Sequence, residues 1–232
     1  MTRPALLSAT LDLFFPRRCL ACSVFLDHPL SGRRKSGFGI WLCSACRAGL
    51  APAEPALISF LDEPLDRVYS GYYYGGVLEK IIPAWKYHRR YDLFPLVSAL
   101  CGNILRRTAL SPADIDLVVA VPLTSRALRK RGFNQSFHIA EAVAGGLGLK
   151  AEPTRLQKVV ETPHQAALDR QARLQNLKPE VFRVDDPARV RGRRVLLCDD
   201  VMTTGSTLQV AASVLKQAGA AAVSGFTLAR VP

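Results

Sequence analysis

Two adjacent carboxylates followed by a run of hydroxyls form the part of this chain best suited to chemistry. Residues 195–198 are an apolar run typical of a buried strand, and Asp199 and Asp200 stand where that strand is expected to end. The small polar residues that follow are Thr203, Thr204, Gly205, Ser206 and Thr207, the last two of which open a segment with helical spacing. Such a strand–loop–helix turn points several backbone N–H groups at one place, where they can hold a phosphate.

The side chains of this segment divide into phosphate donors and sugar acceptors. Gly205 lets a ligand come close to the backbone, and the hydroxyls around it can donate to phosphate oxygens. Ionised Asp199 and Asp200 only accept hydrogen bonds, which suits the hydroxyls of a sugar, so the segment predicts a site for a ribose 5-phosphate. An ordinary strand end with a capped helix explains the hydroxyls but not the paired carboxylates. The segment has no Gly-Lys-Ser/Thr and no Gly-x-Gly-x-x-Gly, which excludes a Walker A loop and a dinucleotide fingerprint.

A second expected strand, at residues 117–121, is followed by a cluster of positive charge. Arg126, Arg129, Lys130 and Arg131 place four cations within six residues. Ligands of an open α/β sheet bind beyond the carboxyl ends of its strands, so these cations can hold a pyrophosphate. The alternative is the basic face of a helix that binds no ligand.

A polar span at residues 158–180 separates two short apolar segments. Long polar loops in compact domains are often lids over a site. We therefore expect Arg170 and Arg173 to close over a bound diphosphate, and His164 to be an exposed residue of the same loop.

Four of the six cysteines stand in two CxxC pairs separated by twenty residues. The pairs are Cys19 with Cys22 and Cys43 with Cys46. This spacing predicts a two-knuckle zinc site in which four thiolates form a tetrahedron. The alternatives are a redox pair or four free thiols, although a redox CxxC usually stands alone at the start of a helix. Cys101 and Cys198 lie on apolar segments and are expected in the core.

Alternating strand and helix signals fill the rest of the chain, which is the pattern of a parallel α/β sheet. Strands are expected at residues 68–74, 117–121, 195–198 and 221–229. Helices are expected at residues 77–87, 93–106, 137–147 and from 206 to a stop at 216–219. We predict two domains, which are a four-cysteine module with an N-terminal helix at 1–60 and an α/β domain at 61–232.

The composition of the 232 residues is that of a globular protein with a basic surface. Hydrophobic residues make up 49% of the chain, yet no eighteen of them are consecutive, so we expect no membrane span. Residues 5–15 are expected to form an amphipathic helix, and the chain is expected in the cytoplasm, because no signal-peptide cleavage site follows them. The net charge of +12 favours polyanions, although a solvated arginine-rich surface has the same excess.

Residues 195–207 resemble the phosphoribosyl pyrophosphate (PRPP) loop of type I phosphoribosyltransferases. The chain as a whole resembles the ComF family, bacterial proteins associated with natural competence. Besides that loop and the two CxxC pairs, the resemblance is carried by residues 121–136, with Arg131-Gly132-Phe133 at their core, and by residues 165–176. These stretches follow the order that the family uses and cover nearly the whole chain.

The resemblance implies a type I phosphoribosyltransferase-like open parallel sheet flanked by helices, with a small N-terminal zinc module. It implies PRPP as ligand, with Mg2+ at the diphosphate and structural Zn2+ on the four cysteines. The implied catalytic residues are Asp199, Asp200 and Arg131. The implied 5-phosphate ligands are Thr203, Thr204, Gly205, Ser206 and Thr207, and the implied pyrophosphate ligands are Arg126, Arg131, Lys86 and Arg170.

Two hypotheses of function follow from these features. The first is an enzyme, a PRPP-dependent phosphoribosyltransferase whose acceptor the sequence does not specify. The second is a non-catalytic module of the DNA uptake machinery that uses the PRPP site as a sensor and binds single-stranded DNA or DNA uptake and helicase proteins. The intact loop favours the first, and the association of the family with competence favours the second. A zinc-dependent transcription factor is disfavoured because no recognition-helix pattern occurs.

Overall fold

The computed structural model describes most of the chain, in two compact units. The described residues are 17–26, 37–53, 58–59, 64–87, 90–152, 156–160 and 179–232. The smaller unit comprises the described residues of Met1–Ala51 and Gly75–Ala99, and the larger unit those of Pro52–Tyr74 and Leu100–Pro232. The boundary between residues 60 and 61 stays a prediction.

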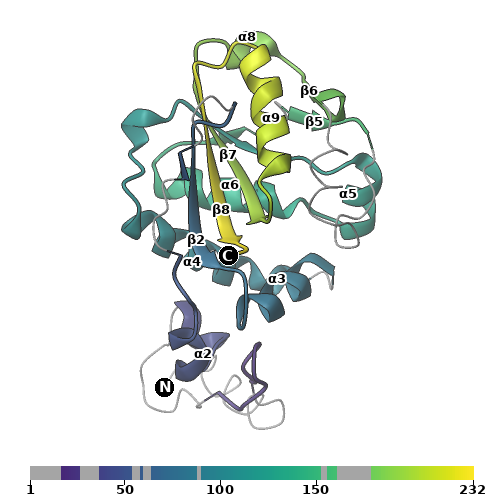
Figure 1. Cartoon of the computed structure of the whole chain (residues 1–232). Coiled ribbons are helices and arrows are strands. Elements are labelled where there is room, and N and C mark those ends of the chain that lie inside the picture. Colours follow the sequence, from purple (N-terminus) through teal and green to yellow (C-terminus); the bar gives the residue numbers. More distant parts are fainter. Residues whose placement is uncertain are drawn as a thin grey trace, which may run out of the picture. The chain divides into compact units, whose positions relative to one another are not determined.

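A six-stranded sheet forms the centre of the larger unit (Figure 1), and its strands lie in the order β1-β2-β8-β7-β3-β4. The strands are β1 (Ile58–Ser59), β2 (Arg67–Tyr73), β3 (Leu117–Ala120), β4 (Ala151–Glu152), β7 (Arg194–Met202) and β8 (Ala222–Arg230). Every neighbouring pair is parallel except β1 with β2. The predicted parallel α/β sheet is confirmed, and the two-residue edge strands β1 and β4 are additions to it.

The central strand β7 is longer than the sequence predicted. Its pairing with β8 continues from Asp199 opposite Thr227 to Met202 opposite Arg230. The predicted end at residue 198 is therefore wrong, because the ladder of backbone hydrogen bonds outlasts the apolar run. Asp199 and Asp200 therefore lie within the strand and not in the loop after it. The regular strand backbone holds both carboxylates in place.

Helices cover both faces of this sheet (Figure 1). The described helices of the larger unit are the C-terminal part of α4 (Phe94–Arg107), α5 (Ser125–Arg131), α6 (Gln135–Gly146), α8 (Pro187–Val190), α9 (Ser206–Gln217) and the short turns η4 (Pro112–Asp114) and η6 (Pro179–Val181). Helix α9 packs on β7 and β8, and α6 packs on β3 and β7 from the other face. A two-stranded antiparallel sheet, β5 (Leu156–Lys158) with β6 (Phe182–Val184), packs beside α9.

The apolar stripe predicted for α9 is confirmed. Leu208, Ala211, Ala212 and Leu215 are all buried in one core cluster with residues of β7 and β8. The helix ends at Gln217, and Gly219 then takes a left-handed conformation with φ of 95°, as expected for a helix stop.

The two cysteines outside the CxxC pairs lie in the core, as predicted. Cys101 and Cys198 both have 0% exposure. Burial raises the pKa of the Cys101 thiol to about 12 and raises that of Cys198 as well, so both remain protonated near neutral pH and pack as small apolar side chains.

The smaller unit consists of short helices around the cysteines and one longer amphipathic helix. Its elements are η2 (Gly37–Ile40), α2 (Ser44–Ala48), α3 (Leu78–Tyr87), η3 (Tyr91–Leu93) and the first part of α4. One side of α3 is buried through Leu78, Ile81, Ile82 and Trp85. The helix expected at residues 5–15, and the basic loop at 31–37 apart from its last residue, lie outside the described residues. Among the helices that the structure describes, none has the length and apolar character needed to cross a bilayer.

An ion pair joins the amino ends of β3 and β7. Asp116 accepts hydrogen bonds from the backbone N, Nε and Nη2 of Arg194 at 2.8, 3.0 and 2.8 Å. These bonds, the side-chain ones above all, hold the pKa of Asp116 well below its ordinary value. The carboxylate therefore stabilises the fold fully above the unfolded pKa of about 3.9, and this contribution is lost as the pH falls toward the folded pKa.

Asp116→Asn is expected to lower the free energy of unfolding at pH 7 by about 1 kcal/mol or less, because the pair is partly exposed. Urea unfolding of both proteins at pH 7 and pH 3 measures the difference. The difference in the free energy of unfolding between wild type and variant should be smaller at pH 3 than at pH 7. A difference that stays constant or increases would contradict this account of the ion pair.

Candidate functional site

The hydroxyl loop, residues 203–207, connects the carboxyl end of β7 to the amino end of α9. Gly205 has a φ of 78° and stands at the N-cap of the helix, a left-handed conformation that glycine adopts without strain. The hydroxyl oxygens of Thr204 and Ser206 lie 2.9 Å apart, and Ser206 N donates to Thr204 Oγ1 at 3.4 Å. Thr203 is exposed and Ser206 is buried. The loop thus places hydroxyls and N–H groups at the positive end of a twelve-residue helix.

The two carboxylates of β7 lie two residues before this loop. Asp200 is only 5% exposed, and Asp199 is half-buried. Asp199 Oδ1 accepts hydrogen bonds from Ser136 Oγ at 2.8 Å and from Asp200 N at 2.9 Å. These contacts fix the carboxylate in one orientation. Such a pair can accept hydrogen bonds from a diol or bind a hydrated Mg2+.

Ser136 and Asn134 were not among the predicted site residues. Asn134 caps α6 by accepting from Ser136 N at 3.0 Å, and its Nδ2 donates to Val121 O at 3.1 Å, just beyond β3. The amino end of α6 therefore links the carboxyl ends of β3 and β7 through Asn134 and Ser136. Asparagine before an apolar helix is a recognisable capping signal, so Asn134 could have been found from the sequence. The contact between Ser136 and Asp199 joins residues 63 positions apart and has no local signal.

The basic cluster after β3 forms the helix α5. Thr124 Oγ1 caps it by accepting from Ala127 N at 3.2 Å, and Gly132 ends it with φ of 89°. Three of its cations are exposed and Arg131 is half-buried. The last turn contains Arg129, Lys130 and Arg131, where cations are also favoured by the helix dipole. Because β3 and β7 are parallel neighbours, α5 begins at the same sheet edge as the hydroxyl loop.

Two of the predicted pyrophosphate ligands, Lys86 and Arg170, are not tested by the described part of the larger unit. Lys86 lies half-buried on α3 of the smaller unit, so its role stays a prediction. Arg170, together with Arg173, His164 and most of the span 158–180, lies outside the described residues.

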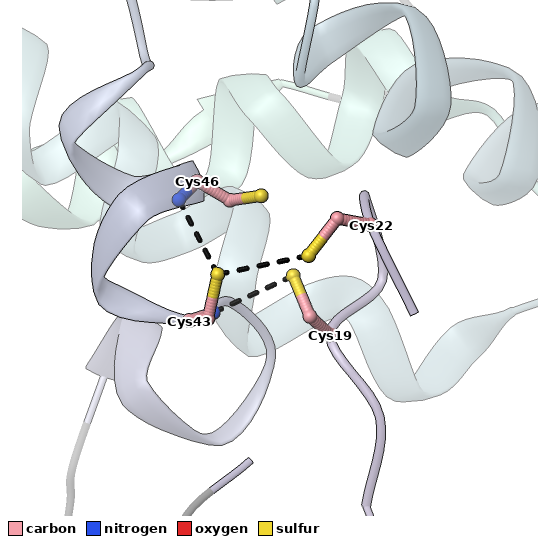
Figure 2. Close-up of side chains that lie close together, drawn as sticks. All are labelled: Cys19, Cys22, Cys43 and Cys46. Atoms are coloured by element: carbon pink, nitrogen blue, oxygen red, sulfur yellow. Dashed lines mark hydrogen bonds between the residues drawn. The ribbon is translucent and has the colours of Figure 1, made fainter. Parts of the chain in front are cut away.

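The four cysteines of the CxxC pairs converge in the smaller unit (Figure 2). All four Sγ atoms lie within 4.8 Å of one another. The Sγ atoms of Cys22 and Cys43 are 3.7 Å apart, close to the spacing of about 3.8 Å between sulfurs around a tetrahedral zinc. Backbone N–H groups of Cys43 and Cys46 donate to sulfur, each at 3.4 Å. The cluster can therefore hold a metal ion.

Local backbone geometry explains how the first pair is presented. Ser23 N donates to Cys19 O at 2.8 Å, and Cys19 N donates to Val24 O at 2.8 Å. Ser23 closes this turn with a φ of 62°, a left-handed conformation that is uncommon for a residue other than glycine. The tight turn places both sulfurs of the pair on one side.

The thiols of this cluster strongly influence one another's ionisation. Desolvation raises the pKa of Cys19, but hydrogen bonds from backbone N–H groups, that of Cys43 first, outweigh it and hold the pKa at about 6. Desolvation and the neighbouring thiols raise the pKa of Cys46. Four close sulfurs cannot all ionise by themselves because like charges repel, whereas a central divalent cation stabilises all four as thiolates.

Known proteins share the sequence of this chain over most of its length. The phosphoribosyl transferase domain family matches residues 135–232. The DNA utilization protein YhgH of Salmonella typhimurium (strain LT2) is 32% identical over 198 residues, which cover 82% of this chain and 84% of that protein. Competence protein ComFC of Bacillus subtilis (strain 168) is 25% identical over 204 residues, which cover 87% of this chain and 77% of that protein.

A solved structure described as the allosteric regulatory enzyme of purine biosynthesis aligns with a TM-score of 0.43 and 21% identity. The alignment covers 63% of this chain and 30% of that much longer one.

The parallel sheet, the hydroxyl loop at the end of its central strand and the matching domain define a phosphoribosyltransferase-like protein. The similarity extends beyond that domain, since the two relatives align with 82% and 87% of this chain. The chain belongs to the ComF family of type I phosphoribosyltransferase-like proteins, associated with competence and DNA utilization. The predicted family and fold class are confirmed.

Proposed function

We propose that the chain binds PRPP together with Mg2+ at the edge formed by β7 and α9. The observation that supports this most is a hydroxyl loop at the N-terminus of α9, two residues after a pair of carboxylates of which one is 5% exposed. The N–H groups and dipole of α9 favour the 5-phosphate. Asp199 and Asp200 accept hydrogen bonds from the two ribose hydroxyls. The match to the phosphoribosyl transferase domain family supports this class of ligand.

Each charged part of PRPP then meets a different group of the protein. Arg126 and Arg131 of α5 receive the diphosphate. Asp199 and Asp200 would hold Mg2+, which would neutralise part of the diphosphate charge when bound. Anchoring the 5-phosphate in the hydroxyl loop converts remote binding energy into orientation of C1. In a transferase, the cations stabilise the leaving diphosphate, and the carboxylates favour the positive charge that develops on the ribose ring.

Isothermal calorimetry with PRPP tests the proposal directly. PRPP is expected to bind in the presence of Mg2+ and to bind more weakly when Mg2+ is removed, since the metal neutralises the diphosphate. No binding of PRPP under either condition would overturn the proposal. A screen for pyrophosphate release across bases and amines then separates an enzyme from a binding module.

We propose that the four-cysteine cluster holds structural Zn2+. Its S4 donor set and sulfur spacing fit that ion. Cysteine pairs that bind metal and do not form disulfides are typical of a reducing compartment, which supports the proposal of a cytoplasmic protein.

The biological role that we propose is in DNA uptake. Its support is the names of two relatives, which are a DNA utilization protein and a competence protein. A net charge of +12 favours association with a polyanion. Single-stranded DNA and the proteins that handle it are therefore the proposed macromolecular partners.

Arg131→Gln distinguishes a pyrophosphate site from a DNA site on α5. If the helix binds diphosphate, the variant should lower the affinity for PRPP by about tenfold or more. Its affinity for ribose 5-phosphate, which lacks the diphosphate, should not change. If it binds DNA, PRPP affinity should stay the same. The slope of the logarithm of DNA affinity against the logarithm of salt concentration should become shallower by about one. Equal losses for both sugars without any change in DNA binding would contradict both versions.

A further inference from the structure

Three strands of the larger unit end in register at the edge that carries the hydroxyl loop. Tyr73, the last residue of β2, pairs with Arg230, the last residue of β8. Arg230 also pairs with Met202, the last residue of β7. Tyr74 N donates to Arg230 O at 2.7 Å, and Val231 N donates to Met202 O at 2.9 Å. Arg230 therefore lies one strand away from the start of the hydroxyl loop.

Arg230 is half-buried, and its guanidinium has few partners among the described residues. Its Nη2 donates to Tyr73 Oη at 3.2 Å, and its central carbon lies 5.1 Å from the centroid of the tyrosine ring. Its Nε is buried without an acceptor, and no carboxylate in the described part of the chain lies within ion-pair distance of it. Partial burial of a cation without a counter-ion costs free energy, which an anionic ligand offsets.

The strand order separates this cation from the phosphates of PRPP. β8 lies on one side of β7, and β3 lies on the other. In the proposed function, the loop after β7 takes the 5-phosphate and the basic helix after β3 takes the diphosphate. A nucleophile that displaces the diphosphate reaches C1 from the side opposite to it. At the carboxyl ends of the strands, Arg230 of β8 thus lies on the side of β7 from which the acceptor arrives.

We propose that Arg230 and Tyr73 form a recognition site for the acceptor, and that this acceptor is an aromatic carboxylate. The remaining N–H donors of the guanidinium form a planar fork that matches a carboxylate, and planar rings stack on guanidinium and tyrosine. This inference rests on the proposed PRPP function. With an aromatic amine as nucleophile, its nitrogen bonds to C1, the C1–O bond breaks, and the diphosphate leaves with the electron pair while the amine releases a proton.

Calorimetric titration with 2-aminobenzoate and with aniline, its analogue without the carboxylate, tests this site. Both titrations are carried out on the ligand-free protein and on the protein saturated with PRPP and Mg2+. Wild type is expected to bind 2-aminobenzoate more tightly than aniline. Arg230→Gln should lower the affinity for 2-aminobenzoate by about tenfold or more, which is the effect of losing a charged hydrogen bond. Its affinities for aniline and for PRPP should not change.

Two further variants make the result specific to the guanidinium fork. Arg230→Lys retains the charge without the planar fork, so its loss of 2-aminobenzoate affinity should be intermediate. Arg189→Gln removes an exposed arginine of α8, whose Nε lies 3.5 Å from Asp186 Oδ2, and should change nothing.

Two outcomes would overturn the inference. Equal affinity of wild type for 2-aminobenzoate and aniline would show that no cation recognises the carboxylate. A loss of PRPP affinity in Arg230→Gln as large as the loss of 2-aminobenzoate would assign Arg230 to a phosphate. Failure of the PRPP proposal is seen separately, as absence of PRPP binding to wild type, while titration of the ligand-free protein still reports on Arg230.

Discussion

Protein with Cys43→Ser and Cys46→Ser is expected to lose its zinc completely, whereas the unaltered chain should carry about one equivalent per chain. The double variant leaves only two of the four sulfurs that lie within 4.8 Å of one another, and two ligands do not complete a structural tetrahedral site. Metal analysis of protein purified without chelator measures the difference. Because a structural zinc contributes directly to folding, the smaller unit of the variant should also become accessible to proteases.

The position of Cys43 allows loss of the metal to be separated from loss of a helix. Cys43 is the N-cap of α2, and its sulfur accepts from Cys46 N. Serine is one of the preferred N-cap residues, so the single variant Cys43→Ser should keep α2 and still bind zinc poorly. Cys101→Ala, at a buried cysteine of the larger unit, should keep the full equivalent. Zinc absent from wild type, or unchanged in the double variant, would refute the site.

Much of the fold was predictable because its signals are local. The strand β3 and the first half of β7 are short apolar runs, and α9 has an apolar stripe with a glycine stop. The strand β7 shows the limit of this reasoning. Its apolar run ends at Cys198, but pairing with β8 extends it to Met202, because strand length is decided by the neighbouring backbone and not by side-chain polarity.

The candidate site likewise has one part that could be predicted from the sequence and one part that could not. The carboxylates and the hydroxyl loop are only two residues apart in the sequence, so their chemistry could be predicted from their spacing. The bond from Ser136 to Asp199 and the pair formed by Tyr73 and Arg230 join residues 63 and 157 positions apart. Only the register of neighbouring strands and helices brings such residues together. Tertiary contacts of this kind have no periodicity in the sequence.

Asp199→Asn and Asp200→Asn are each expected to weaken PRPP by about tenfold or more, and together to abolish measurable binding. Loss of the charge from a group that accepts a buried hydrogen bond costs about 1.5–3 kcal/mol. Asparagine keeps the shape of the side chain. In Asp199→Asn its oxygen can still accept from Ser136 Oγ and from Asp200 N, the two contacts made by Asp199 Oδ1, so the local fold should persist while the negative charge is removed.

The controls for these variants come from the same strands and the same loop. Asp116→Asn removes a carboxylate at the opposite, amino end of β3 and β7 and should leave PRPP affinity unchanged. Ser136→Ala frees Asp199 from its hydroxyl donor, and a modest loss is expected because the carboxylate is then less well oriented. Thr204→Ala should weaken PRPP and ribose 5-phosphate alike, since both carry the 5-phosphate. Tight, Mg2+-dependent binding of PRPP by the double aspartate variant would show that the ribose hydroxyls are held elsewhere, and the carboxylates of β7 would then have no role in the ligand site.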